Sequence, residues 1–268
     1  MNAYKIEAGT AQHLGSRAQQ NDRAALFLGA RAPGFVLAVL ADGFTGHASA
    51  AEQVLQTAKQ VFDQFKPGDH PSIARLEELL REIVHEAHLI IKLNGVSSQT
   101  EQHSTVVLLV LTPHGEAVWA HVGESRLYRF QQGQPAERSQ DSAYVAHLIA
   151  AENIPPEAAK QYRASKLLTN AIGRQDKEPF VICGAHQPLA AGDCFLLASD
   201  GLWRYFTDAE LAAVTSKSTP RQAADLLIPK AQERAKGQGD NCTMAIIKLI
   251  EPPKEAPSYT VQKLGKAV

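Results

Sequence analysis

Nine short runs rich in β-branched and aromatic residues restrict the possible folds of this chain more than any other feature. Gly, Pro, Asp or Ser bounds each run, which is the pattern of short strands separated by turns. These runs, which we expect to form strands, are 4–7, 25–29, 35–40, 105–111, 117–122, 127–130, 180–183, 195–198 and 243–249. Several follow one another directly, and two long helical patterns are grouped between them, at 49–65 and 72–93. This order favours an α+β protein, a β-sandwich of antiparallel sheets with helical layers outside.

Two further helices are expected in the second half of the chain. One begins at Thr219, which can cap it, because Pro220 suits the first helical position and Gln222 completes a capping box; it runs to about residue 235. The other covers 142–152. A Pro-rich stretch follows residue 250, so we expect one domain over 1–250 and a linker or tail over 251–268 that leads to a further part of a longer protein.

The composition excludes several classes of function. A formal net charge of −1 over 268 residues gives no basic surface for nucleic acid or an anionic membrane. No apolar run approaches the roughly 20 residues that cross a bilayer, and the N-terminus has no signal pattern, so we expect a cytoplasmic protein. The cysteines, Cys183, Cys194 and Cys242, lack the close Cys or His partners of a zinc site, and we expect buried free thiols.

Acidic residues stand where several of the expected strands end. Asp42-Gly43 follows one strand, Asp200-Gly201 follows another, Glu124 follows a third, and Asp240 precedes the last. An Asp-Gly pair by itself is also a common turn. Together, however, carboxylates gathered at one rim need cations, and oxygen ligands without Cys or His suit Mg²⁺ or Mn²⁺. The glycine after Asp42 would leave a backbone carbonyl accessible as one more ligand.

Five segments, in their order and in their amino-acid sequences, resemble those of the metal-dependent type 2C protein phosphatases, the PPM family, in their bacterial form. The segments are 15–22 (GSRAQQND), 41–47 (ADGFTGH), 122–128 (VGESRLY), 197–203 (LASDGLW) and 239–243 (GDNCT). Ser104-Thr105 and 167–173 look like two further family landmarks. The resemblance covers nearly all of the chain before residue 250. It implies a four-layer α-β-β-α sandwich, two antiparallel sheets flanked by helices, and hydrolysis of phosphoserine and phosphothreonine in proteins.

The resemblance also assigns a two-metal centre. Asp42, Asp200 and Asp240 would hold a first Mn²⁺ or Mg²⁺ ion, and Asp42 with the carbonyl of Gly43 would hold a second, whose waters Asp22 positions. Two such ions activate a water against phosphorus, so that no phosphoenzyme is needed. The partners implied are a phosphorylated protein substrate and a tethered or cognate Ser/Thr kinase.

Two basic side chains have expected roles in the same site. Arg17 matches the arginine that binds the substrate phosphate, and a guanidinium fork suits two phosphate oxygens. His47 follows the Asp-Gly segment, and its position favours proton donation to the leaving alkoxide as much as a structural role.

Three departures from the family pattern concern this site. Asn21 stands where a Glu is usual, which removes a carboxylate near the second ion. Glu124 replaces an Asp at which bacterial members bind a third, weaker metal ion, and its longer side chain is expected to reach that ion. Phe44 replaces a small residue and predicts an apolar wall.

Two other functional classes stay open at this point. The changes at Asn21 and Glu124 favour a pseudophosphatase, a signalling module that binds phosphoproteins without turnover, while the three retained aspartates favour an enzyme. A different two-metal hydrolase such as a nuclease is disfavoured by the neutral charge. A cysteine-based phosphatase is excluded, because no cysteine is followed six positions later by an arginine.

Overall fold

The computed structural model describes residues 4–44, 49–140 and 170–252, and they form two antiparallel sheets packed face to face. The first sheet has five strands in the order β1-β11-β10-β7-β8. Its strands are β1 (Lys5–His13), β7 (Arg126–Gln131), β8 (Gln134–Arg138), β10 (Asp193–Ala198) and β11 (Cys242–Ile250).

The second sheet has the order β2-β3-β5-β6-β9, and the short strand β4 pairs with the end of β3. Its strands are β2 (Asp22–Leu28), β3 (Val36–Phe44), β4 (His103–Ser104), β5 (Val106–Leu111), β6 (Ala117–Val122) and β9 (Ile182–His186). Every pairing within the two sheets is antiparallel, as the sequence predicts.

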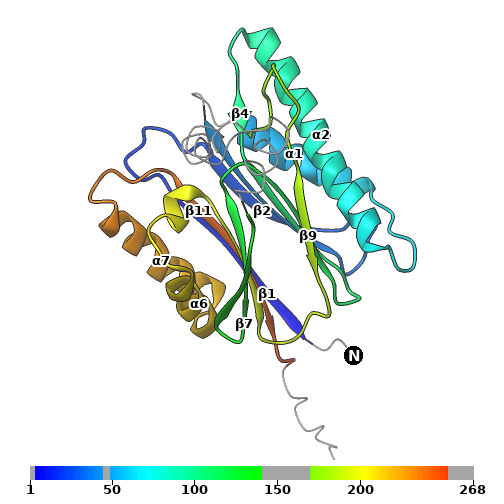
Figure 1. Ribbon diagram of the computed structural model, residues 1–268, viewed down its shortest axis with the longest axis vertical. Coiled ribbons are helices and arrows are strands. Elements are labelled where there is room, and N and C mark those ends of the chain that lie inside the picture. Colours follow the sequence, from blue (N-terminus) through cyan, green and yellow to red (C-terminus); the bar gives the residue numbers. More distant parts are fainter. Residues whose placement is uncertain (1–3, 45–48, 141–169, 253–268) are drawn as a thin grey trace, which may run out of the picture.

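Helices cover the outer face of each sheet, which makes four layers (Figure 1). On the second sheet lie α1 (Ser49–Gln64) and α2 (Ile73–Ser98), and on the first lie α5 (Asp200–Trp203), α6 (Asp208–Lys217) and α7 (Pro220–Arg234). The expected α+β sandwich, with two antiparallel sheets flanked by helices, is confirmed.

The central strands are apolar along their whole length because both of their faces are covered. In β3, Val36, Ala38 and Leu40 belong to the core between the sheets, while Leu37, Val39 and Ala41 belong to the core under α1 and α2. Strand β10 divides in the same way between the middle core and the core under α5–α7. Burial of each valine or leucine side chain contributes about 1.5–3 kcal/mol, so the strands are held firmly in register.

All nine expected strands and the helices α1, α2 and α7 are present, with ends that differ by a few residues. The capping box of Thr219 and Gln222 is confirmed. The sequence patterns missed β4, β8, α5 and α6, although Thr207 and Glu210 form a second capping box at the start of α6. The helix expected at 142–152 and most of the expected tail lie outside the described residues.

The three cysteines are free, with Cys194 and Cys242 buried. None of the helices in the described ranges has the length and apolarity to cross a bilayer.

Strand register brings the acidic strand ends to one rim of the sandwich. Asp22 at the start of β2 lies opposite Asp42 at the end of β3. In the other sheet, Ala198 at the end of β10 pairs with Met244 of β11. Strand β11 begins two residues after Asp240. This is the rim at which β4 joins β3, at the top of Figure 1.

Candidate functional site

A cavity of about 310 Å³ opens at this rim, and the four acidic residues expected from the strand ends all line it. Its described lining consists of Asp42, Phe44, Thr105, Gly123, Glu124, Asn170, Asp200 and Asp240. The two sheets therefore deliver carboxylates to one place, as the sequence predicts.

Hydrogen bonds with Ser104 of β4 and with Thr105 fix the position of Asp42. The Asp42 carbonyl oxygen accepts hydrogen bonds from the Thr105 N–H at 2.9 Å and the Ser104 hydroxyl at 3.0 Å. The Asp42 N–H donates to Thr105 Oγ1 at 3.2 Å, and that hydroxyl also pairs with Ser125 at 2.7 Å. The Ser104-Thr105 landmark thus holds the aspartate segment in place, a role that the sequence did not reveal.

Asp22 lies behind Asp42 and is 1% exposed. Burial raises the pKa of Asp22 to about 6. Burial and the neighbouring Asp22 also raise the pKa of Asp42 well above its ordinary value. Burial and the proximity of the two acids thus both disfavour their charged forms.

A glycine allows Asp200 to approach the start of β11. At Gly201, an added Cβ would lie 2.0 Å from the backbone oxygen of Asn241. No side chain fits at that distance, so the Asp-Gly pair here serves close packing of two backbones and is more than a turn signal. Burial raises the pKa of Asp200, while the charge of Arg204 opposes this shift.

Arg17 holds Asp240 from the loop between β1 and β2. Its Nε lies 2.7 Å from Asp240 Oδ1 and its Nη2 lies 2.6 Å from Oδ2, so the guanidinium takes both carboxylate oxygens. The hydrogen bonds to Asp240 and its charge raise the pKa of Arg17. The side chain is 60% exposed and reaches the site across the surface.

Asn241 fastens that loop to the site. Its Oδ1 accepts a hydrogen bond from the Asn21 N–H at 2.7 Å, and its Nδ2 donates to the carbonyls of Leu14 at 2.8 Å and Gln19 at 3.0 Å. The residue after Asp240 therefore sets the course of the chain that carries Arg17. Sequence reasoning gave Asn241 no role, because its partners are about 220 residues away.

Arg204 is a second arginine of the site, and the sequence reasoning missed it. Its Nη2 lies 2.8 Å from Glu124 Oε2 and 2.9 Å from Asp200 Oδ2. Burial acts to lower the pKa of Arg204, but the charges of Asp200 and Glu124 outweigh it and raise the pKa. The spacing of four residues between Asp200 and Arg204 was the available signal.

The donor set fits hard divalent cations, although the side chains are not arranged around one. Among the described residues, no three His, Cys, Asp or Glu side chains are placed to hold one ion as they stand. The two arginines hold oxygens of Asp240, Asp200 and Glu124. Buried Asp22 Oδ2 and Asn21 Oδ1 have no hydrogen-bond partner. Unpartnered buried oxygens beside carboxylates of raised pKa are what Mg²⁺ or Mn²⁺ would satisfy.

Two expectations at the cavity edge have different outcomes. Phe44 lines the cavity and its ring lies 5.6 Å from that of His103, so the apolar wall is present. His47 lies outside the described residues.

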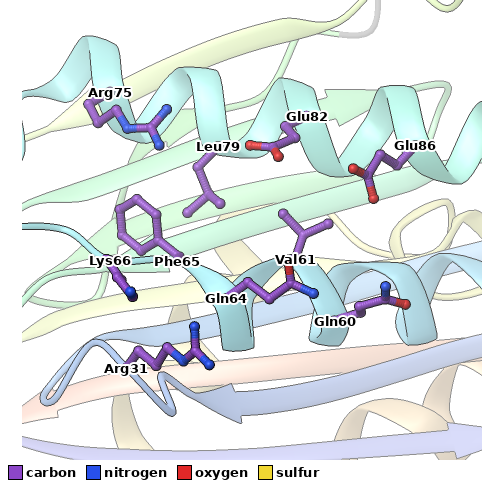
Figure 2. Close-up of a pocket in the computed structure, with 10 residues that line it drawn as sticks. All are labelled: Arg31, Gln60, Val61, Gln64, Phe65, Lys66, Arg75, Leu79, Glu82 and Glu86. Carbon is purple, nitrogen blue, oxygen red and sulfur yellow. The ribbon is translucent and has the colours of Figure 1, made fainter.

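A second hollow, of about 430 Å³, lies between α1 and α2 and contains none of these residues (Figure 2). Arg31, Lys66 and Arg75 gather at one end of it, and Glu82 and Glu86 lie at the other. Arg75 is already paired with Glu78 at 3.2 Å. This mixed polar surface supports no chemistry comparable to that of the rim cavity.

Known proteins resemble this chain over most of its length, although no protein-family model matches it. The serine/threonine phosphatase stp of Listeria innocua is 26% identical over 235 residues, which cover 82% of this chain and 88% of the relative. A putative protein phosphatase 2C-type of Streptococcus pyogenes is 26% identical over 216 residues, covering 80% of this chain and 86% of the relative.

Solved structures share the fold. The serine/threonine phosphatase of S. agalactiae superposes with a TM-score of 0.75 at 24% identity, over 92% of this chain and all of that one. The catalytic domain of the serine/threonine protein phosphatase PstP, in complex with 2 manganese ions, gives a TM-score of 0.67 at 24% identity, over 92% of this chain and 99% of that one. In sequence the chain is thus similar to bacterial serine/threonine phosphatases, among them a putative 2C-type enzyme, and it shares the fold of their solved structures.

Proposed function

We propose that the protein hydrolyses phosphoserine and phosphothreonine in other proteins with divalent cations bound in the rim cavity. The observation that carries this proposal is the convergence of Asp42, Glu124, Asp200 and Asp240 on one cavity, from strands of both sheets. A site with so many carboxylates needs cations before it can accept a phosphate, which is itself an anion.

The resemblance to type 2C phosphatases supplies the proposed ligands. Asp42, Asp200 and Asp240 hold a first ion, and Asp42 with the carbonyl of Gly43 holds a second, with Asp22 positioning water. When bound, two Mn²⁺ or Mg²⁺ ions lower the pKa of a water and neutralise charge on the phosphoryl group. The PstP catalytic domain, which has the same fold, binds two manganese ions.

Arg17 is the proposed phosphate-binding group. In the structure it holds both oxygens of Asp240, at 2.7 and 2.6 Å. Because Arg17 holds both oxygens of Asp240, a cation that binds this carboxylate competes with the guanidinium and repels it, so metal binding would release the fork. The same fork geometry then suits two oxygens of the substrate phosphate.

Fewer contacts support the remaining proposals. Phe44 and Asn170 line the cavity and would flank the phosphorylated residue. His47 as proton donor to the leaving alkoxide, a cognate Ser/Thr kinase as partner, and residues 1–250 as the catalytic unit with a linker at 251–268 stay predictions.

The arrangement of the arginines also favours a second candidate, a binding module without turnover. Arg17 and Arg204 pair with three of the carboxylates without any metal ion. Such a protein would bind phosphoproteins and leave the phosphate ester intact.

Hydrolysis by metal-stripped protein separates the two candidates. We expect no turnover of p-nitrophenyl phosphate or a phosphothreonine peptide until Mn²⁺ or Mg²⁺ is added. Asp200→Asn should lower the metal-restored rate by at least about 100-fold, because Asp200 is a proposed ion ligand. Full activity of Asp200→Asn would show that the ligand assignment is wrong, and absence of turnover at every metal concentration would favour the binding module.

A further inference from the structure

Arg204 is a cation that the protein itself supplies inside the acidic site. One guanidinium nitrogen bridges Glu124, which follows β6 of the second sheet, and Asp200, which follows β10 of the first, at 2.8 and 2.9 Å. The two carboxylates are largely buried, with side chains 19% and 12% exposed, whereas Arg204 is 49% exposed. A single positive charge thus joins two acids that would otherwise repel each other.

Local structure fixes this arrangement. The Arg204 N–H donates to the Asp200 carbonyl at 3.3 Å at the end of α5, so the two side chains leave the same helical turn. Trp203 Nε1 donates to the Glu124 carbonyl at 3.1 Å and anchors the other partner to the same turn. The Arg204 guanidinium also lies 5.6 Å from the centre of the Trp203 ring. These contacts place Arg204 before any ligand arrives.

The two arginines of the site use carboxylate oxygens differently. Arg17 engages both oxygens of Asp240. The shortest contacts of Arg204 are with Oε2 of Glu124 and Oδ2 of Asp200, one oxygen of each acid. Asp200 can therefore present its other oxygen to a divalent cation while Arg204 stays, whereas a cation on Asp240 competes with Arg17 for both oxygens.

We propose that Arg204 stays on Glu124 and Asp200 when metal ions bind, that it keeps Glu124 from acting as a metal ligand, and that it limits the site to two divalent cations. The inference rests on the proposed two-metal function. It replaces the expectation of a third ion at Glu124. An ion held jointly by Glu124 and Asp200 would have to occupy the place of the guanidinium, which bridges these two carboxylates.

Titration of Mn²⁺ into metal-stripped protein, followed by calorimetry, tests the proposal through stoichiometry rather than activity. We expect two ions per chain for the wild type and a third, weaker ion for Arg204→Gln, which frees both carboxylates. The double variant Arg204→Gln/Glu124→Gln should return to two. Arg138→Gln is the matched control, because Arg138 pairs with Asp208 at 3.2 Å with a side chain 44% exposed but lies away from the cavity.

Each other outcome has a definite meaning. Three ions on the wild type, reduced to two by Glu124→Gln, would overturn the proposal and leave the two-metal function standing. Two ions on Arg204→Gln would overturn it as well, since the arginine would then exclude nothing. A wild type that binds no Mn²⁺ would overturn the proposed function together with this inference.

Discussion

The two sides of the site hold their carboxylates by different means. On one side Arg17 reaches Asp240 from a loop, is 60% exposed, and belongs to a segment 223 residues away in the sequence. On the other side Arg204 and Asp200 leave one helical turn, four residues apart, and Arg204 also holds Glu124. An ion pair made across the surface by a long side chain is easily exchanged, whereas one built within a turn and supported by Trp203 is in place from the start. The first suits a group that moves to substrate and the second suits a fixed charge.

The largest effect is expected at Gly201, where α5 packs closely against the start of β11. Gly201→Ala would place a Cβ 2.0 Å from the Asn241 backbone oxygen, so one of the two segments must shift. We expect a loss of about 3 kcal/mol in the free energy of unfolding, with weaker Mn²⁺ binding because Asp200 and Asp240 separate. Urea denaturation measures the first and calorimetry the second.

Gly68→Ala is the control for that substitution. Gly68 has φ +71° but nothing within 4 Å of an added Cβ, so only the backbone conformation is penalised, by about 1 kcal/mol. Equal losses at the two positions would contradict the close-packing role of Gly201.

The second effect concerns the exchangeable arginine. Arg17→Ala should lower kcat/KM for a phosphothreonine peptide by about 100-fold with Mn²⁺ bound, because two phosphate oxygens lose their partner. Metal-free stability should change by less than about 1 kcal/mol, since the pair with Asp240 is exposed. Steady-state kinetics and denaturation in a chelator give the two values, and unchanged kcat/KM would remove Arg17 from the phosphate site.

The third effect is a pH dependence of the free energy of unfolding, to which Asp22 contributes. Its pKa is raised by burial from 3.8 to about 6, so the folded state binds more protons than the unfolded state between these values. The free energy of unfolding of metal-free protein should therefore fall as the pH rises from about 4 to 6, by an amount on the order of 2–3 kcal/mol.

Asp22→Asn should reduce this slope, because the asparagine does not titrate, although Asp42, whose pKa burial also raises, still does. Saturating Mn²⁺ should restore stability at pH 7, by about 2.7 kcal/mol at 100 times the dissociation constant. Denaturation curves across this pH range would contradict the prediction if stability rose between pH 4 and 6.

The smallest effect is expected for Arg204, the arginine that we propose to stay in place. Arg204→Gln leaves Asp200 and Glu124 without their shared cation, and we expect metal-free protein to lose about 1 kcal/mol, because Arg204 is half exposed. The loss should exceed that of Arg17→Ala in the same assay. The reverse order would mean that the loop arginine is the fixed one.

The sequence by itself determined most of the strands and long helices and indicated the kind of site. Periodicity predicted the strands of both sheets and the long helices, since burial on one or both faces leaves a pattern in neighbouring residues. The acids at the strand ends predicted an oxygen-ligand site at one rim, because antiparallel strands in register place their ends together. Short elements such as β4 and α5 left no pattern long enough to be seen.

Only the tertiary structure decided how the carboxylates are partnered. The pair of Arg17 with Asp240 and the hydrogen bonds of Asn241 to the β1–β2 loop join segments more than 220 residues apart. The bridge of Arg204 to Glu124 joins residues 80 apart. Nothing local in the chain encodes such contacts, because they depend on the packing of two sheets and on the direction of each side chain. For the same reason the sequence did not show that Arg204 lies beside Glu124, where it predicted a third metal ion.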